Sequence, residues 1–110
     1  MYNLCLDIYK LTKAFPREER YNLTSQIRRA VVSVPSNIAE GYGRKTTPEY
    51  IRSLYIAYGS NCELETQILL AGDLGYIKSE QLQKVQEAIG ESEGMLKALI
   101  KSLESKHSNP

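Results

Sequence analysis

Cationic side chains of the N-terminal half are the residues of this sequence best suited to chemistry with a ligand. The set consists of Arg28, Arg29, Arg44, Lys45 and Arg52. Arg and Lys bind phosphate groups through their charge, and the Arg guanidinium adds two parallel hydrogen bonds to an anion. These residues therefore predict a candidate nucleic-acid-binding surface. The alternative is a solvated charged face whose cations pair with Glu40 and Glu49.

Tyrosine is the second notable residue type, with eight in the chain. Proteins that bind nucleic acid stack aromatic rings on exposed bases. Tyr42 adjoins Arg44 and Lys45 and is the best-placed tyrosine for stacking, with packing as the alternative. Tyr55 and Tyr58 fall on an apolar helix face, where filling a core or a subunit interface is the simpler role.

The net charge of the chain is small but unevenly distributed. Fourteen Lys and Arg against thirteen Asp and Glu give a formal charge of +1. Residues 1–52 carry nine basic and five acidic side chains, hence +4, whereas residues 53–110 carry five and eight, hence −3. A basic patch must come mainly from the first half, and its field would add up if several subunits formed a ring.

Composition argues against enzymatic and metal chemistry. The chain has one histidine, His107, within a polar tail at 105–110 that we expect to fray. Catalytic triads, Cys–His pairs, multi-histidine metal sites and the Glu-x-x-His pairs of di-iron bundles are therefore unavailable. Cys5 and Cys62 lack metal-ligand spacing, and we expect buried free thiols, with one disulfide as the alternative. No enzyme, metal or cofactor is predicted.

Apolar residues recur at helical spacing in four segments, which predict helices at about 1–15, 22–43, 47–73 and 79–104. Short connections favour antiparallel neighbours, and steps of three and four favour left-handed packing. We predict one all-α domain over residues 1–110, an up-down antiparallel left-handed four-helix bundle that assembles into a homo-oligomeric ring. The sequence shows neither a signal peptide nor a membrane span, so we expect a cytoplasmic protein.

Several residues interrupt these apolar faces. Pro35 lies inside the second helix, where we expect a kink rather than a break. Gly59 and Ser60 are expected to let the third helix approach the second closely. The face of the third helix predicted to be buried consists of Ile51, Tyr55, Tyr58, Cys62, Glu65 and Leu69. A buried polar network is predicted from Gln26, Arg29, Asn37 and Glu65, because a buried carboxylate needs a partner.

Two runs carry a resemblance to a known family. They are residues 15–44, FPREERYNLTSQIRRAVVSVPSNIAEGYGR, and residues 54–67, LYIAYGSNCELETQ. Over residues 6–77 the chain resembles the four-helix bundle family encoded in bacterial 23S rRNA intervening sequences. The resemblance implies a homo-oligomer, commonly a pentamer with a central channel. It also implies kinship with the accessory variability determinant proteins of diversity-generating retroelements, which bind nucleic acid and a reverse transcriptase.

Taken together, these features predict a non-enzymatic homo-oligomer that binds RNA or DNA or assists a reverse transcriptase. The alternative is a structural or protein-scaffolding oligomer without affinity for nucleic acid. Members of the family usually begin with a longer first helix that carries a Trp. This chain has no Trp, so we expect a shortened first helix.

Overall fold

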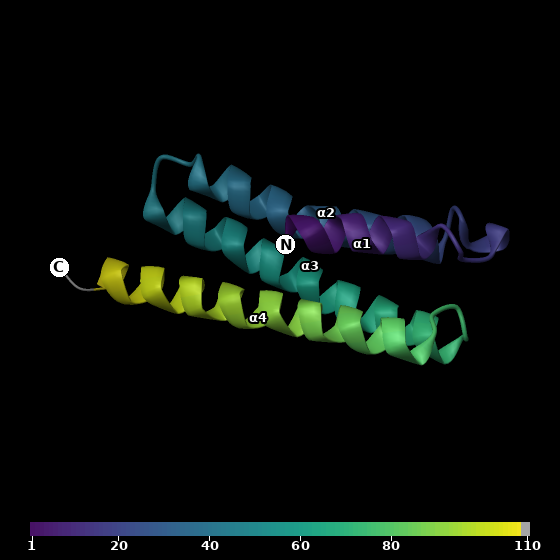
Figure 1. Cartoon of the computed structure of the whole chain (residues 1–110). Coiled ribbons are helices and arrows are strands. Elements are labelled where there is room, and N and C mark those ends of the chain that lie inside the picture. The colour runs from purple at the N-terminus through teal and green to yellow at the C-terminus, as the bar shows by residue number, and fades with distance from the viewer. Residues whose placement is uncertain (109–110) are drawn as a thin grey trace.

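The computed structural model describes residues 1–108, which form helices and no strand. The elements are α1 (Tyr2–Thr12), the short 3-10 helix η1 (Arg17–Glu19), α2 (Leu23–Tyr42), α3 (Thr47–Asp73) and α4 (Ser79–Ser108). Consecutive α-helices run in opposite directions along a molecule that measures 53 × 24 × 19 Å (Figure 1). The predicted all-α fold with four helices is confirmed.

Two helix ends differ from the prediction. The first helix ends at Thr12 rather than at residue 15, because the amides of residues 13–15 bond to carbonyls three residues back and Pro16 has no amide hydrogen to continue the ladder. The last helix continues beyond residue 104 to Ser108, so the predicted end of this helix was wrong, and residues 105–108 of the predicted tail are helical. Lys106 and His107 lie in its final turn, where positive charge suits the negative end of a helix. Residues 109 and 110 lie outside the described part of the chain.

The sequence specifies the ends of α3 through local chemistry. The Thr46 hydroxyl accepts a hydrogen bond of 3.3 Å from the Glu49 amide, and Pro48 occupies the first turn, where its missing amide hydrogen costs nothing. After α3, Gly75 has φ of +81°, which glycine adopts without steric cost. Its amide donates to the Gly72 carbonyl at 3.0 Å and closes the turn into α4.

Pro35 is accommodated within α2, which runs through it without a break. Proline has no amide hydrogen, so it leaves the Val31 carbonyl without its usual helical donor. The Cys5 thiol of α1 donates to that carbonyl at an S···O distance of 3.3 Å. Burial raises the pKa of this thiol, which therefore keeps the proton that it donates. The proline thus supplies an acceptor at the place where α1 docks.

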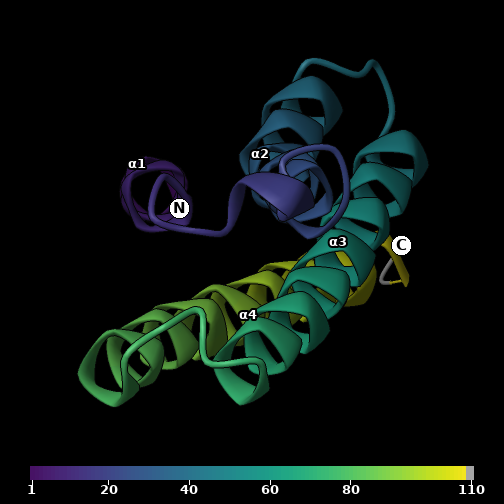
Figure 2. The ribbon, with the colours of Figure 1, turned by 90° about the vertical axis from the view of Figure 1, so that its right-hand side faces the viewer.

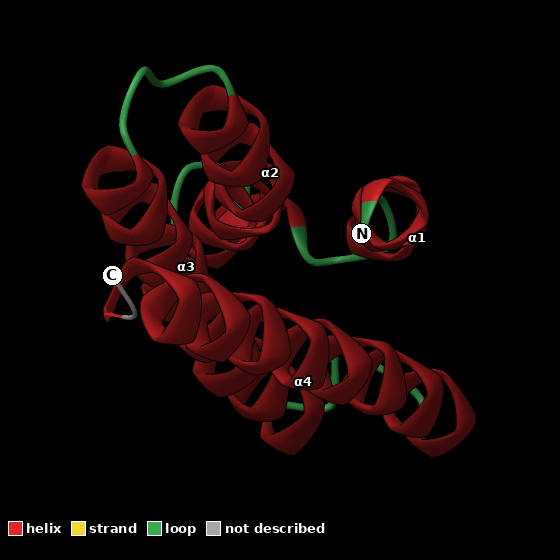
Figure 3. Cartoon of the chain, turned by 90° about the vertical axis from the view of Figure 1, so that its left-hand side faces the viewer, coloured by secondary structure: helices red, strands yellow, loops and turns green. Residues whose placement is uncertain are grey.

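The α-helices do not contribute equally to the core. Helix α3 packs against α2 and α4, whereas the shorter α1 lies next to α2 and α4 and has no Cα atom within 8 Å of one in α3. Seen along the bundle, α1 lies beside α2 and across from α3 (Figure 2, Figure 3). Around α1 the core is built on Ile8, Ile27, Ile68 and Ile89, and beyond α1 it is built on Val34, Leu54, Leu96 and Ile100.

The predicted buried face of α3 is wrong in its register. The buried residues are Ser53, Leu54, Ala57, Asn61, Leu64, Gln67, Ile68 and Ala71. The predicted face lies about one residue, or 100°, away. Consequently Tyr55 and Leu69 are 50% and 49% exposed, and Cys62 and Glu65 are exposed as well. Both cysteines are free thiols, but only Cys5 is buried, so the expectation of a buried thiol was wrong for Cys62.

Helices α2 and α3 approach each other closely at a different glycine from the one predicted. Gly59 is exposed, and a Cβ built on it would meet nothing within 4 Å. A Cβ on Gly41 would instead lie 2.6 Å from the Cβ of Ser53. Ser60 does contribute to the contact, since its hydroxyl lies 2.8 Å from that of Ser33 on α2.

Candidate nucleic-acid interface

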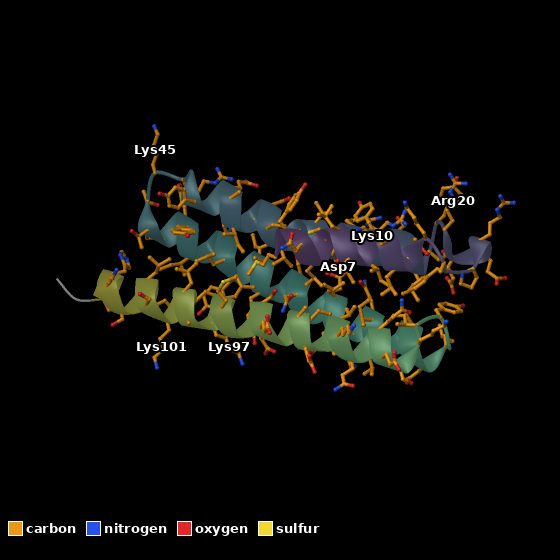
Figure 4. The ribbon with its side chains drawn as sticks, viewed as in Figure 1. Asp7, Lys10, Arg20, Lys45, Lys97 and Lys101 are labelled. Carbon is orange, nitrogen blue, oxygen red and sulfur yellow. The ribbon has the colours of Figure 1, made fainter. Side chains whose placement is uncertain are left out.

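The six residues predicted to bind nucleic acid form two groups at opposite ends of α2. Arg28 and Arg29 lie near its start, whereas Tyr42, Arg44, Lys45 and Arg52 lie at or beyond its end. At 1.5 Å per residue, the helix separates Arg28 from Tyr42 by about 21 Å along its axis. Lys45 marks one end of the molecule and Arg20 the other (Figure 4). In one protomer the six residues therefore do not form a single patch.

The charge of the group at the end of α2 is partly compensated by acidic residues. The guanidinium of Arg44 forms an ion pair with Glu40 one turn earlier. A hollow of about 340 Å³ here is lined by two arginines, Arg44 and Arg52, and by two carboxylates, Glu40 and Glu49. Arg44 thus has the internal pair that the alternative of a solvated charged face predicts, whereas Lys45 and Arg52 are in neither of the ion pairs found among residues 1–108.

Tyr42 lies in the same compensated region. Its side chain is 79% exposed, and its ring meets Tyr50 edge to face with the two ring centres 6.1 Å apart. This contact holds the ring against α3 and uses part of its surface for packing. The ring is open to solvent but lies away from an uncompensated cation cluster.

The group at the start of α2 belongs to a larger cationic surface. A hollow of about 410 Å³ is lined by Tyr9, Arg20, Tyr21, Thr24, Ser25, Arg28 and Arg29. A second hollow of about 260 Å³ shares Arg20, Thr24 and Arg28 with it and adds Lys13 and Arg17. We call the five basic residues Lys13, Arg17, Arg20, Arg28 and Arg29 the cationic face. No carboxylate lines either hollow.

Arg28 is held in position by contacts with α1. Its Nε donates to the Thr12 hydroxyl at 2.9 Å, and its Nη2 donates to the Tyr9 carbonyl at 3.3 Å. Its guanidinium carbon also lies 4.8 Å from the centre of the Tyr9 ring. No carboxylate offsets the positive charge of Arg28 in these contacts, because its partners are two neutral oxygen atoms and an aromatic ring.

A second arginine and tyrosine pair precedes α2. The Arg20 guanidinium carbon lies 5.3 Å from the centre of the Tyr21 ring. Both side chains are exposed, and the ring of Tyr21 is 82% accessible. Among residues 1–108, the ion pairs are Arg44–Glu40 and Lys97–Glu93, so all members of the cationic face lack an acidic partner.

Comparison with known proteins assigns this fold to a family. The family model described as 23S rRNA-intervening sequence protein matches residues 1–98. The chain belongs to this family. The family resemblance seen in the sequence is therefore confirmed, and the relation to retroelement accessory proteins stays a prediction. A search of curated proteins gives no match.

A solved structure supports the fold of this family member. It is the crystal structure of a protein from Bacteroides thetaiotaomicron, described as a protein of unknown function from the S23 ribosomal protein family. The two chains share 26% sequence identity and superpose with a TM-score of 0.84. The match covers 91% of this chain and 94% of that chain.

The predicted polar network does not form in this intervening-sequence protein. Gln26, Arg29 and Glu65 are exposed, and Glu65 lies on the outer face of α3 because of the register difference described above. Asn37 instead donates from Nδ2 to the carbonyl of Ser33 at 2.8 Å and to its hydroxyl at 2.9 Å. Both contacts lie within α2, and the Ser33–Ser60 hydrogen bond joins them to α3.

One deeply buried polar residue of the bundle, Asn61, was not predicted from the sequence. Asn61 is 2% exposed, and its Nδ2 donates to the Ile89 carbonyl of α4 at 3.1 Å. The predicted buried face of α3 is one residue out of register, so it contains Cys62 in place of the neighbouring Asn61. Likewise, Tyr9, Arg20 and Tyr21 were missed because Arg20 and Tyr21 belong to a connection and Tyr9 lies on another helix.

Two kinds of feature are absent from the described residues. Residues 1–108 bring together no group of three or more His, Cys, Asp or Glu side chains that could hold a metal ion. No helix among them is both long and apolar enough to cross a membrane.

Proposed function

We propose that this family member is a non-enzymatic nucleic-acid-binding protein that uses the cationic face. The observation that carries the proposal is the set of five basic side chains around two adjoining hollows without a carboxylate. Four of the five are arginines, which match the geometry of phosphate oxygens better than lysines. The face combines elements far apart in the sequence, since η1, α2 and the end of α1 all contribute to it.

Charge compensation distinguishes this face from the rest of the surface. At the other end of α2, Glu40 pairs with Arg44, and Glu49 lines the same hollow as Arg44 and Arg52. A phosphate approaching there meets two carboxylates, one of them already paired with an arginine, whereas no carboxylate lines the hollows of the cationic face. Counterion release makes such binding strongly dependent on salt.

Binding to a labelled oligonucleotide, followed by fluorescence anisotropy, tests the proposal. If all five cations contact phosphates of a single strand, affinity falls by about 100-fold between about 50 and 200 mM salt. We expect the double variant Arg20→Ala with Arg29→Ala to bind about 10-fold more weakly and with a shallower salt dependence. Both side chains are exposed, so the fold stays intact.

The matched control removes two exposed lysines of α4, Lys101→Ala with Lys106→Ala. Lys101 projects from the opposite side of the molecule (Figure 4). Both double variants lose the same charge, so equal weakening would mean that binding follows net charge rather than the cationic face. Absence of binding by the parent protein at low salt would refute the proposal.

We also propose that the chain forms a homo-oligomeric ring, with the pentamer as the expected state. The support is an apolar outer stripe on α3, formed by Tyr55, Ile56, Leu69 and Leu70, each between 48% and 50% exposed. The four residues form two exposed apolar pairs about 20 Å apart along the helix axis, and such surface can be buried between subunits. A ring would repeat the cationic face and raise the avidity for a long polyanion.

The outer stripe also favours a second candidate function, a protein scaffold without affinity for nucleic acid. Light scattering after size exclusion tests the assembly with Ile56→Glu and with Met95→Glu, an equally apolar exposed residue of α4, as the control. We expect the first variant to dissociate the assembly and the second to leave it intact. A monomeric parent protein would refute the ring. A reverse transcriptase as partner and a cytoplasmic location stay predictions.

A further inference from the structure

We propose that the ligand of the cationic face is single-stranded nucleic acid, and that Tyr21 and Tyr9 stack on its unpaired bases. This inference rests on the function proposed above and specifies the class of its ligand. It derives from the two arginine–tyrosine pairs that line one hollow.

Tyr21 is exposed far beyond what its chemistry favours. Its side chain is 82% accessible although a phenol ring gains free energy when its apolar surface leaves water. It belongs to the turn between η1 and α2, which is closed by a hydrogen bond of 3.0 Å from the Asn22 amide to the Glu19 carbonyl. The ring is therefore presented from a structured turn, with the Arg20 guanidinium over it.

Tyr9 is presented in a similar way from α1. Its side chain is 41% exposed, and the Arg28 guanidinium lies over its ring. Two hydrogen bonds hold this arginine in place, as described above, and restrict its departure from the ring. A base that stacks on the accessible part of the ring thus meets an aromatic surface already fixed in orientation.

The chemistry of the hollow selects single strands over duplexes. Bases in a duplex are stacked on one another and paired, so their faces cannot reach a tyrosine, whereas unpaired bases stack on exposed rings in any sequence. Arg29 and Arg20 border the same hollow and are exposed, which places phosphate-binding charge beside the stacking surfaces. A duplex can use only the charges; a single strand can use both the charges and the rings.

Binding of fluorescein-labelled single strands and of the corresponding duplex tests the inference. The probes are a 15-nucleotide oligodeoxythymidylate, the matching oligouridylate and the duplex of the first with its complement. We expect the single strands to bind at least about 10-fold more tightly than the duplex at equal salt. Comparing the two single strands then separates DNA from RNA as the source of the shared chemistry.

Tyrosine variants provide the specific measurement. Replacement of one stacking ring costs about 5- to 150-fold in affinity, so Tyr21→Ala should weaken single-strand binding by this factor and leave duplex binding unchanged. Tyr21→Phe keeps the ring and should bind like the parent protein. Tyr42→Ala removes an equally exposed tyrosine at the other end of α2 and should have no effect.

The outcomes separate this inference from the function on which it rests. If the parent protein binds neither single strands nor duplex at low salt, both proposals fail. If it binds both equally, in a way that depends on Arg20 and Arg29 but not on Tyr21, the stacking inference is overturned and the cationic face stands. Tight binding of an acidic polypeptide such as polyglutamate, with no preference for nucleic acid, would also overturn it.

Discussion

Helices α2 and α3 are in close contact at Gly41, so alanine is expected to destabilise the protein at this glycine and to stabilise it at Gly90, which has no close neighbour. A Cβ on Gly41 would lie 2.6 Å from the Cβ of Ser53 and 3.0 Å from a ring carbon of Tyr50. Carbon atoms pack at about 3.5–4.0 Å, so Gly41→Ala requires the two helices to separate by about 1 Å. A Cβ on Gly90, in the middle of α4, meets nothing within 4 Å.

The magnitudes follow from these two environments. Overpacking costs about 1–3 kcal/mol, whereas alanine gains at most about 1 kcal/mol over glycine in a helix, and less in the last turn, where Gly41 lies. Gly41→Ala should therefore lower the free energy of unfolding by about 1–2 kcal/mol, and Gly90→Ala should raise it by about 1 kcal/mol. In a domain of this size, 1 kcal/mol shifts Tm by about 4–8 °C.

Chemical and thermal unfolding followed by circular dichroism, at one protein concentration, measure both effects. A double-mutant cycle adds Ser53→Gly, which removes the nearest atom from the path of the new Cβ. We expect Ser53→Gly to destabilise the parent protein but to recover stability in the Gly41→Ala background. If Gly41→Ala stabilises the protein as Gly90→Ala does, the helices are not in contact at Gly41 and the packing argument is refuted.

Three further predictions concern buried and hydrogen-bonded groups. Asn61→Asp places a carboxylate in the core, where burial raises its folded-state pKa above the unfolded value of about 4. The variant should lose about 3 kcal/mol at neutral pH and regain this stability as the pH falls through the folded-state pKa toward about 4, as measured by unfolding at several pH values. The pKa of Tyr76 is raised by its hydrogen bond to Glu19, by desolvation and by nearby negative charge. The stability that this tyrosine contributes is therefore present below about pH 10 and is lost as the pH rises through its raised pKa. The Tm of Tyr76→Phe should change less than that of the parent protein as the pH rises above about 10. Ellman's reagent should label Cys62 rapidly and Cys5 only on unfolding, and equal rates would contradict the burial of Cys5.

The candidate site was only partly accessible from the sequence. Arg28 and Arg29 were identified because adjacent arginines on a helix are visible in a linear pattern. Their partners were not, since Tyr9 lies 19 residues before Arg28 and meets it only when α1 packs on α2. Conversely, Arg44 is predicted to bind phosphate because it is one of the basic residues of the N-terminal half. The spacing of four residues allows Arg44 to form an ion pair with Glu40, but only the side-chain positions in the structure show that the pair forms.

The sequence by itself determined the number, order and approximate ends of the helices, because caps, prolines and apolar periodicity act over a few residues. Thr46 and Pro48 specify the start of α3, and Gly75 specifies the turn after it, independently of how the helices pack. Only the tertiary structure decided which face of α3 is buried. Rows of apolar residues about 100° apart, one through Leu54 and one through Tyr55, have the same helical period, and local propensity does not distinguish them. Helix α3 packs between α2 and α4 with the row of smaller side chains buried, and in the other row Ile51 and Tyr58 are half-buried while Tyr55 and Leu69 are exposed.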